Sequence, residues 1–252
     1  MMNKIIIAFL VVAACGCNSG NTSKTIKVTK PVEHITATND QQDRRNKSEA
    51  YCKQHNIPVY SNPNALFVDP ESEVVIRTKD EVVDRALALC YIGVKSEGLE
   101  QEFLDKFDKA FNISSKLSPK EKAYATAAHP TEQQKIDANW RYEGLHVMLW
   151  ALGYIDSLSY PNQVCNVAND VKIINNLKNE GFRQQAKLRS KQEILDQADL
   201  ILRLHWACVS ARLDNKPSPG GLDNSVVVER HYALNWLIKY MNQAWDDIET
   251  NT

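Results

Sequence analysis

Two histidines occupy positions where the helical period predicts apolar side chains. His205 and His231 each lie on the apolar stripe of a predicted helix. A buried imidazole must find a hydrogen-bond partner or stay uncharged. Nearby candidates for that partner are Cys208, Arg212, Glu229 and Asn235. We favour a polar network that fixes the register of packed helices. The alternative is a general acid–base pair, or part of a metal site, that also uses Glu229.

A second polar pair falls on a long predicted helix. Glu143 and His146 are three residues apart, so their side chains share one face of that helix. A carboxylate in this position can orient a catalytic imidazole, although a local polar pair beside the core is the more common outcome. The candidate catalytic residues are therefore His205, His231, Glu229 and Glu143. The residues expected in a structural polar network are Arg141, Arg212, Arg230 and Asn235.

Motifs that would define a reaction are absent from the sequence. It contains no G-x-S-x-G, P-loop, G-x-G-x-x-G or H-E-x-x-H pattern. His205 and Cys208 share a helical face, but two ligands fall short of the three or four that a zinc site uses. We therefore expect no metal site and no cofactor, and we expect Asp246, Asp247 and Glu249 to form a solvated acidic tail. Whether the protein is an enzyme stays open, and the sequence leans against it.

Helices must position all of these residues. Capping boxes begin at Thr78 and Ser190, Ser118-Pro119 gives a third start, and Thr131 gives a fourth. Strand-like alternation is scarce and is confined to Val74–Ile76 and the region around Val59. The pattern predicts an all-α fold, a compact multi-helix domain over residues 46–252. The expected helices span about residues 78–98, 99–111, 118–128, 131–153, 171–181, 190–213 and 224–242.

The composition of the chain excludes some classes of protein. The 252 residues carry 30 Lys and Arg against 31 Asp and Glu, a formal net charge of −1. A nucleic-acid-binding protein would show a basic excess, so we expect no nucleic-acid partner. Cys90 and Cys208 fall on apolar stripes, where cysteine acts as a small hydrophobic residue. We expect no structural disulfide among the cysteines of the domain, which are Cys52, Cys90, Cys165 and Cys208.

The first residues indicate export. Ile5–Ala14 is an apolar run of ten residues, too short to span a membrane but typical of a signal peptide. Val12-Ala13-Ala14-Cys15 resembles the lipobox of bacterial lipoproteins. This resemblance implies cleavage after residue 14, lipidation of Cys15 and anchoring in the outer membrane or the cell membrane. Residues 15–45 are rich in polar side chains and predict a flexible, disordered tether.

Several blocks of the predicted domain resemble a bacterial family known as domain of unknown function 4272. The resemblance spans about residues 75–252 and implies a compact, mostly helical domain without an assigned activity. Its blocks are EVVDRALAL at 81–89, WRYE at 140–143, LWALG at 149–153, KLRSK at 187–191, HWAC at 205–208, ERHYALNW at 229–236 and WDD at 245–247.

Together these features predict a membrane-anchored lipoprotein of the cell envelope. Its domain would serve as a binding or structural module, with an envelope protein as a possible partner and the membrane reached through Cys15. The alternative is an enzyme, a hydrolase with an acid–base or metal site made by His205, His231 and Glu229. A converging, open arrangement of these three side chains would favour the enzyme.

Overall fold

The computed structural model describes residues 36–62 and 66–252. The chain divides into two units, residues 1–34 and residues 35–252, and only the second is described here. The predicted signal peptide, Cys15 and most of the predicted tether lie outside the described residues. Within the described ranges, no helix is long and apolar enough to cross a membrane.

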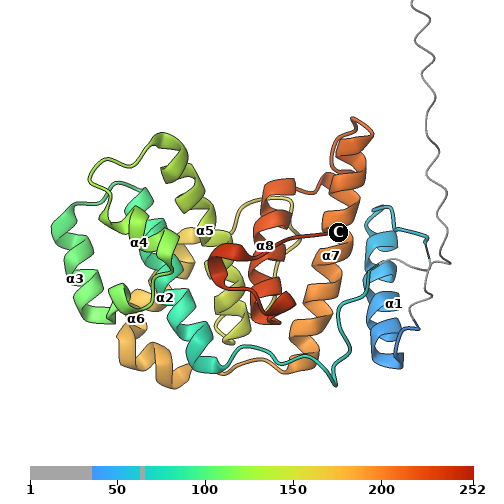
Figure 1. Cartoon of the computed structure of the whole chain (residues 1–252), viewed down its shortest axis with the longest axis horizontal. Coiled ribbons are helices and arrows are strands. Elements are labelled where there is room, and N and C mark those ends of the chain that lie inside the picture. The colour runs from blue at the N-terminus through green and yellow to red at the C-terminus, as the bar shows by residue number, and fades with distance from the viewer. Residues whose placement is uncertain (1–35, 63–65) are drawn as a thin grey trace, which may run out of the picture. The chain divides into compact units, whose positions relative to one another are not determined.

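The described domain is all-α, as predicted, and its described residues contain no strand. Short 3₁₀ turns supplement the α-helices, and the helices follow one another around a single apolar core (Figure 1). The α-helices are α1 (Asn39–Gln54), α2 (Lys79–Ser96), α3 (Gln101–Phe111), α4 (Pro119–Thr126), α5 (Glu132–Ala151), α6 (Val167–Gln185), α7 (Lys191–Leu213) and α8 (Asn224–Leu237).

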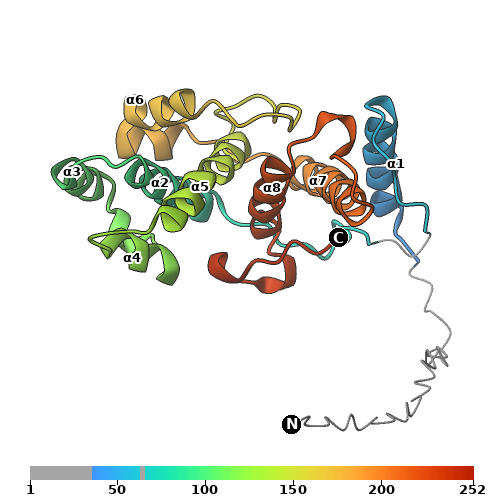
Figure 2. The same cartoon turned by 90° about the horizontal axis from the view of Figure 1, so that it is seen from above.

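Helices α2 and α5 form the most extensive helix pair of the core. Gly93 of α2 permits their close approach, because a Cβ atom at this position would lie 2.5 Å from Cε1 of Tyr142 on α5. Helices α3, α4 and α6 surround this pair, while α8 packs between α5 and α7 (Figure 2). Helix α8 therefore presents one side to α5 and another to α7, and this arrangement decides where its polar residues go.

The predicted helix starts are confirmed. Thr78, Ser118, Thr131 and Ser190 each form a capping box with the residue three positions later. At Ser190, for example, the hydroxyl accepts a hydrogen bond from the backbone N–H of Glu193 at 3.2 Å, and Glu193 accepts one from the N–H of Ser190 at 3.0 Å. These contacts satisfy backbone donors that a helix start leaves free.

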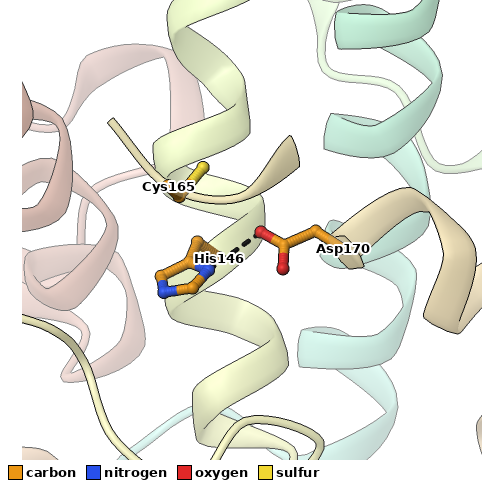
Figure 3. Close-up of side chains that lie close together, drawn as sticks. All are labelled: His146, Cys165 and Asp170. Atoms are coloured by element: carbon orange, nitrogen blue, oxygen red, sulfur yellow. Dashed lines mark hydrogen bonds and ion pairs between the residues drawn. The ribbon is translucent and has the colours of Figure 1, made fainter. Parts of the chain in front are cut away.

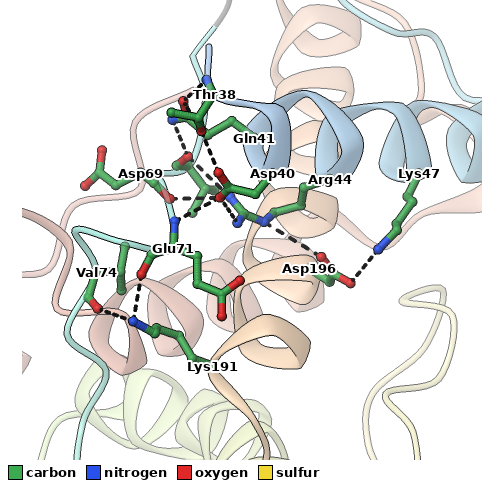
Figure 4. Close-up of polar contacts among 11 residues, drawn as sticks. Thr38, Asp40, Gln41, Arg44, Lys47, Asp69, Glu71, Val74, Lys191 and Asp196 are labelled. Atoms are coloured by element: carbon green, nitrogen blue, oxygen red, sulfur yellow. Dashed lines mark hydrogen bonds and ion pairs between the residues drawn. The ribbon is translucent and has the colours of Figure 1, made fainter.

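Helix α1 was not predicted, and it begins at Asn39, inside the range expected to be tether. The sequence pattern fails here because α1 has no apolar stripe: its buried residues are Gln41, Arg44, Arg45, Ser48 and Cys52. Polar contacts attach it to the domain instead (Figure 4). Arg44 and Lys47 contact Asp196 of α7 at 3.7 and 3.3 Å, and Nε2 of Gln41 donates to the carbonyl of Val68 at 2.9 Å.

The last predicted helix was too long. Helix α8 ends at Leu237 instead of near residue 242, because Lys239 and Met241 adopt positive φ angles of 52° and 50° that turn the chain. Helix α6 is longer than predicted and bends at Lys178, whose φ is 56°. The segment Val74–Ile76 forms neither a helix nor a strand.

The four cysteines of the domain are free thiols, as predicted. Cys52, Cys90, Cys165 and Cys208 are all buried and unpaired. They pack as small hydrophobic side chains within the core cluster.

Candidate functional site

A cavity lies between α2, α4, α5, α8 and the segment after α8. Its volume of about 570 Å³ falls within the size range of small-molecule sites. The cavity has an exposed polar rim and a buried floor with aromatic walls. Its lining residues are Ile92, Lys120, Glu121, Ala123, Tyr124, Gln134, Asp137, Ala138, Arg141, Tyr232, Trp245 and Asp246.

One wall comes from the segment after α8, which is fixed to the start of α4. The carboxylate of Asp246 accepts hydrogen bonds from the Ser118 hydroxyl at 2.6 Å and from the Lys120 backbone N–H at 2.9 Å. An acidic side chain at a helix N-terminus is favoured by the free backbone donors and the helix dipole. The expectation that Asp246 belongs to a solvated tail is therefore wrong. This contact holds Trp245 beside the cavity.

Glu121, which lines the cavity, belongs to a buried ion pair with Arg85. Nη2 of Arg85 donates to Oε2 of Glu121 at 2.7 Å, and both side chains are buried. Three neighbouring polar atoms, Nε of Arg85, Oε1 of Glu121 and the hydroxyl of Tyr124, have no hydrogen-bond partner within the described part of the chain. Unpartnered buried polar atoms are uncommon and costly. Two of these atoms belong to residues that line the cavity, Glu121 and Tyr124.

The opposite wall is also built from paired groups. Nη1 of Arg141 donates to Oε2 of Glu229 at 3.0 Å, and the guanidinium lies 5.1 Å from the ring centroid of Tyr232. The Tyr232 hydroxyl donates to the carbonyl of Trp245. Burial raises the pKa of Tyr232 to about 12, so its phenol stays protonated as a donor. Burial also raises the pKa of the Glu229 carboxyl, against the lowering effect of Arg141.

Glu143 and Arg230 form a buried ion pair next to this wall. Nε of Arg230 donates to Oε2 of Glu143 at 3.0 Å, and both side chains are only 2% exposed. Glu143 also accepts a hydrogen bond from the backbone N–H of Cys165 at 2.5 Å, while Arg230 donates to the carbonyl of Ser159 at 2.6 Å. Glu143 thus pairs with Arg230 instead of with His146. The pair fastens the loop between α5 and α6 to α8.

His205 and His231 meet each other elsewhere in the core. Their Nδ1 atoms are 2.8 Å apart, and both rings are buried. Burial lowers the pKa of His205 to about 4, with a further contribution from the charge of Arg212. Burial likewise lowers the pKa of His231 to about 3. Both rings are therefore neutral at pH 7, with one Nδ1–H donating to the other ring.

The four candidate catalytic residues do not converge on one site. Glu229 contacts α5 whereas His231 contacts α7, so their side chains leave α8 in different directions. Among the residues expected in a structural network, Arg230 and Asn235 are buried; Nδ2 of Asn235 donates to the carbonyl of Glu249 at 2.8 Å. Arg141 is half-buried at the cavity, and Arg212 is exposed on the surface.

Several residues of the cavity were missed by sequence reasoning. The position of Glu121 at the start of a helix could be predicted from Ser118, the residue that caps that helix. Only one of the two Glu121 oxygens accepts the capping hydrogen bond, and the other has no partner in the described part of the chain. Nothing in the sequence indicated that Tyr124 and Trp245 line a cavity, because aromatic residues on helices usually belong to the core. They reach the cavity through the packing of α4 and of the segment after α8, which no local pattern reveals.

The fold and the cavity define a class: a helical domain with a mixed polar and aromatic pocket and no converged catalytic group among the residues predicted from sequence. Within that class, the chain belongs to the family described as Domain of unknown function (DUF4272), whose model matches residues 44–248. No curated protein and no solved structure matches the chain.

Proposed function

We propose that this protein is a small-molecule-binding module of the bacterial cell envelope, anchored in a membrane through lipidated Cys15. The observation that carries the binding role is the 570 Å³ cavity, whose lining residues Glu121 and Tyr124 each keep one polar atom without a hydrogen-bond partner. Ligand pockets combine apolar walls with a few polar groups that orient the ligand.

The chemistry of the cavity indicates what the ligand offers. The aromatic rings of Tyr124, Tyr232 and Trp245 suit a flat or apolar body. The free oxygen of Glu121 accepts a hydrogen bond, so a hydroxyl, amide or amine on the ligand supplies the matching donor.

The binding role is tested with the full chain, purified in mild detergent, by screening a small-metabolite library for ligands that raise its melting temperature. Ala138→Met places a larger side chain in the cavity and should abolish the shift. Tyr124→Phe removes only the unpartnered hydroxyl, so it should weaken binding while leaving the fold intact. A ligand that stabilises the wild type and Ala138→Met to the same extent must bind outside the cavity. A screen that finds no stabilising ligand would contradict the proposal.

The anchor rests on the lipobox-like Val12–Cys15 and has its own test. Cells expressing the chain are grown with a labelled fatty acid, and the label should appear in the wild-type protein. Cys15→Ser should eliminate the label and release the protein from the membrane fraction. The neighbouring Cys17→Ser is the matched control and should keep both. Label that depends on Cys17 alone would contradict lipidation of Cys15.

A further inference from the structure

Three side chains of metal-ligating type meet in the core, apart from the lining of the cavity described above. His146 comes from α5, Asp170 from the start of α6, and Cys165 from the segment just before α6 (Figure 3). One ligand atom from each lies within 4.8 Å of the other two. All three residues are buried, with 7%, 0% and 8% of their surface exposed, respectively.

The polar atoms of this cluster are incompletely satisfied. Nδ1 of His146 lies 2.8 Å from Oδ2 of Asp170, so the ring donates its Nδ1–H to the carboxylate. Nε2 of His146 and Oδ1 of Asp170 are buried and have no hydrogen-bond partner in the described ranges. Unpartnered buried polar atoms are uncommon and costly, so this cluster can accept a further partner.

Cys165 is held in place by groups beside the cluster. Its backbone N–H donates to Glu143 at 2.5 Å, and Arg230 in turn holds Glu143 at 3.0 Å. Its thiol donates to the carbonyl of Tyr142 at 3.5 Å. The segment before α6 therefore presents a positioned sulfur next to a carboxylate and an imidazole.

We propose that His146, Cys165 and Asp170 bind a divalent transition-metal ion, with zinc as the best match. Imidazole, thiolate and carboxylate are the three ligand types that zinc accepts. The charges balance, since one carboxylate and one thiolate offset the two positive charges of the ion. Binding breaks the S–H bond of Cys165 and releases that proton to solvent. The hydrogen of the His146 ring moves from Nδ1 to Nε2, so that Nδ1 binds the ion beside the Asp170 carboxylate. A water molecule fills the fourth position.

The distances require a modest adjustment. Bond lengths of about 2.0–2.3 Å place neighbouring ligands of a tetrahedral zinc ion about 3.3–3.8 Å apart. The widest separation in the cluster, 4.8 Å, must therefore shorten by about 1 Å. A bound ion would join α5 to the start of α6. The sequence spacing of these residues resembles no common zinc motif, which is why the pattern of the sequence did not predict the site.

The test uses the full chain with Cys15→Ser and Cys17→Ser, so that no thiol from the first residues contributes. The protein is treated with a chelator and titrated with Co²⁺, a spectroscopic substitute for zinc. We expect one equivalent to bind and to give a thiolate-to-cobalt charge-transfer band that Zn²⁺ abolishes. Cys165→Ser should eliminate the band, and Asp170→Asn should weaken binding at least about tenfold. Cys208→Ser, a buried cysteine of α7, is the matched control and should retain the band.

Three outcomes would overturn the metal site. If the protein with an intact Cys165 shows no thiolate-to-cobalt band, the proposed site does not exist. A band that persists in Cys165→Ser belongs to another cysteine. Circular dichroism of each variant before titration shows whether the helices are intact. If Cys165→Ser does not fold, Asp170→Asn decides the question, and a cobalt affinity that this variant leaves unchanged would overturn the site.

Discussion

Nδ1 of His205 lies 2.8 Å from Nδ1 of His231, and this contact joins α7 to α8 inside the core. Only one of the two nitrogens can carry the shared hydrogen, so the contact exists while at least one ring is neutral. The two rings are near perpendicular, with an angle of 79° between their planes. The pair therefore acts as a structural connection whose strength depends on pH.

Acid should destabilise the domain through this pair. The folded-state pKa values are about 4 for His205 and about 3 for His231, both below the ordinary value of 6.5. The unfolded chain thus binds protons first as the pH falls below about 6.5. Each histidine should lower the free energy of unfolding by about 1.4 kcal/mol per pH unit between about pH 6 and pH 4. Urea unfolding measured at several pH values checks this slope.

The control separates the histidines from carboxylates that titrate nearby. The double variant His205→Leu with His231→Leu should show a shallower pH dependence over the same range. The single variant His205→Leu leaves His231 without its ring partner and should cost about 1–3 kcal/mol at pH 7. Equal slopes in wild type and double variant would rule out the histidine pair as the cause.

Arg230→Met should be strongly destabilising. It leaves the Glu143 carboxylate buried without its cation and frees the carbonyl of Ser159. Breaking a buried ion pair on one side costs about 3–5 kcal/mol. Arg212→Met, at an exposed position of α7, is the matched control and should change stability by less than about 0.5 kcal/mol. Similar denaturant midpoints for the two variants would contradict a structural role for the pair.

Gly93→Ala tests the close contact between α2 and α5. The added methyl group would lie 2.5 Å from the Tyr142 ring, so the helices must move apart. Overpacking of this kind costs about 1–3 kcal/mol. At Gly181 of α6 the nearest atoms to an added Cβ are 3.8 Å away, and Gly181→Ala should stabilise by about 0.5–1 kcal/mol. The melting temperatures should therefore shift in opposite directions, and shifts in the same direction would argue against the close contact.

Asp246→Ala should loosen the cavity wall. It removes the bonds from Ser118 and from the Lys120 backbone to the carboxylate, so we expect a loss of about 1 kcal/mol. The adjacent, exposed Asp247→Ala should be nearly neutral. Tryptophan fluorescence should also change for Asp246→Ala, since Trp245 is next in the chain. An unchanged spectrum and stability would show that the contact does not hold the wall.

The parts of the fold that depend on local chemistry were predictable. Thr131 and Ser190 each bring their own capping partner three residues later, so the helix starts follow from a few neighbouring residues. Helix α1 escaped prediction because ion pairs to Asp196, far along the chain, replace the apolar stripe. The end of α8 escaped because the turn at Lys239 has no glycine to signal it.

The candidate sites were predictable only in part. The inward position of His205 and His231 followed from the helical period, but their pairing depends on how α7 packs against α8. The cavity and the proposed metal site join residues from distant segments, such as Glu121 with Trp245 and His146 with Asp170. Such proximity depends on how the helices pack, and it cannot be predicted from local patterns in a single sequence.

The polar attachment of α1 has a mechanical consequence. If Cys15 is fixed in a membrane, tension on the domain enters at its N-terminal side and reaches α1 before any other helix. The contact of Lys47 with Asp196 is exposed and can be replaced by water, whereas separating α2 from α5 would expose their buried apolar faces. Under a stretching force α1 should peel away first, lengthening the connection while the remaining helices stay folded.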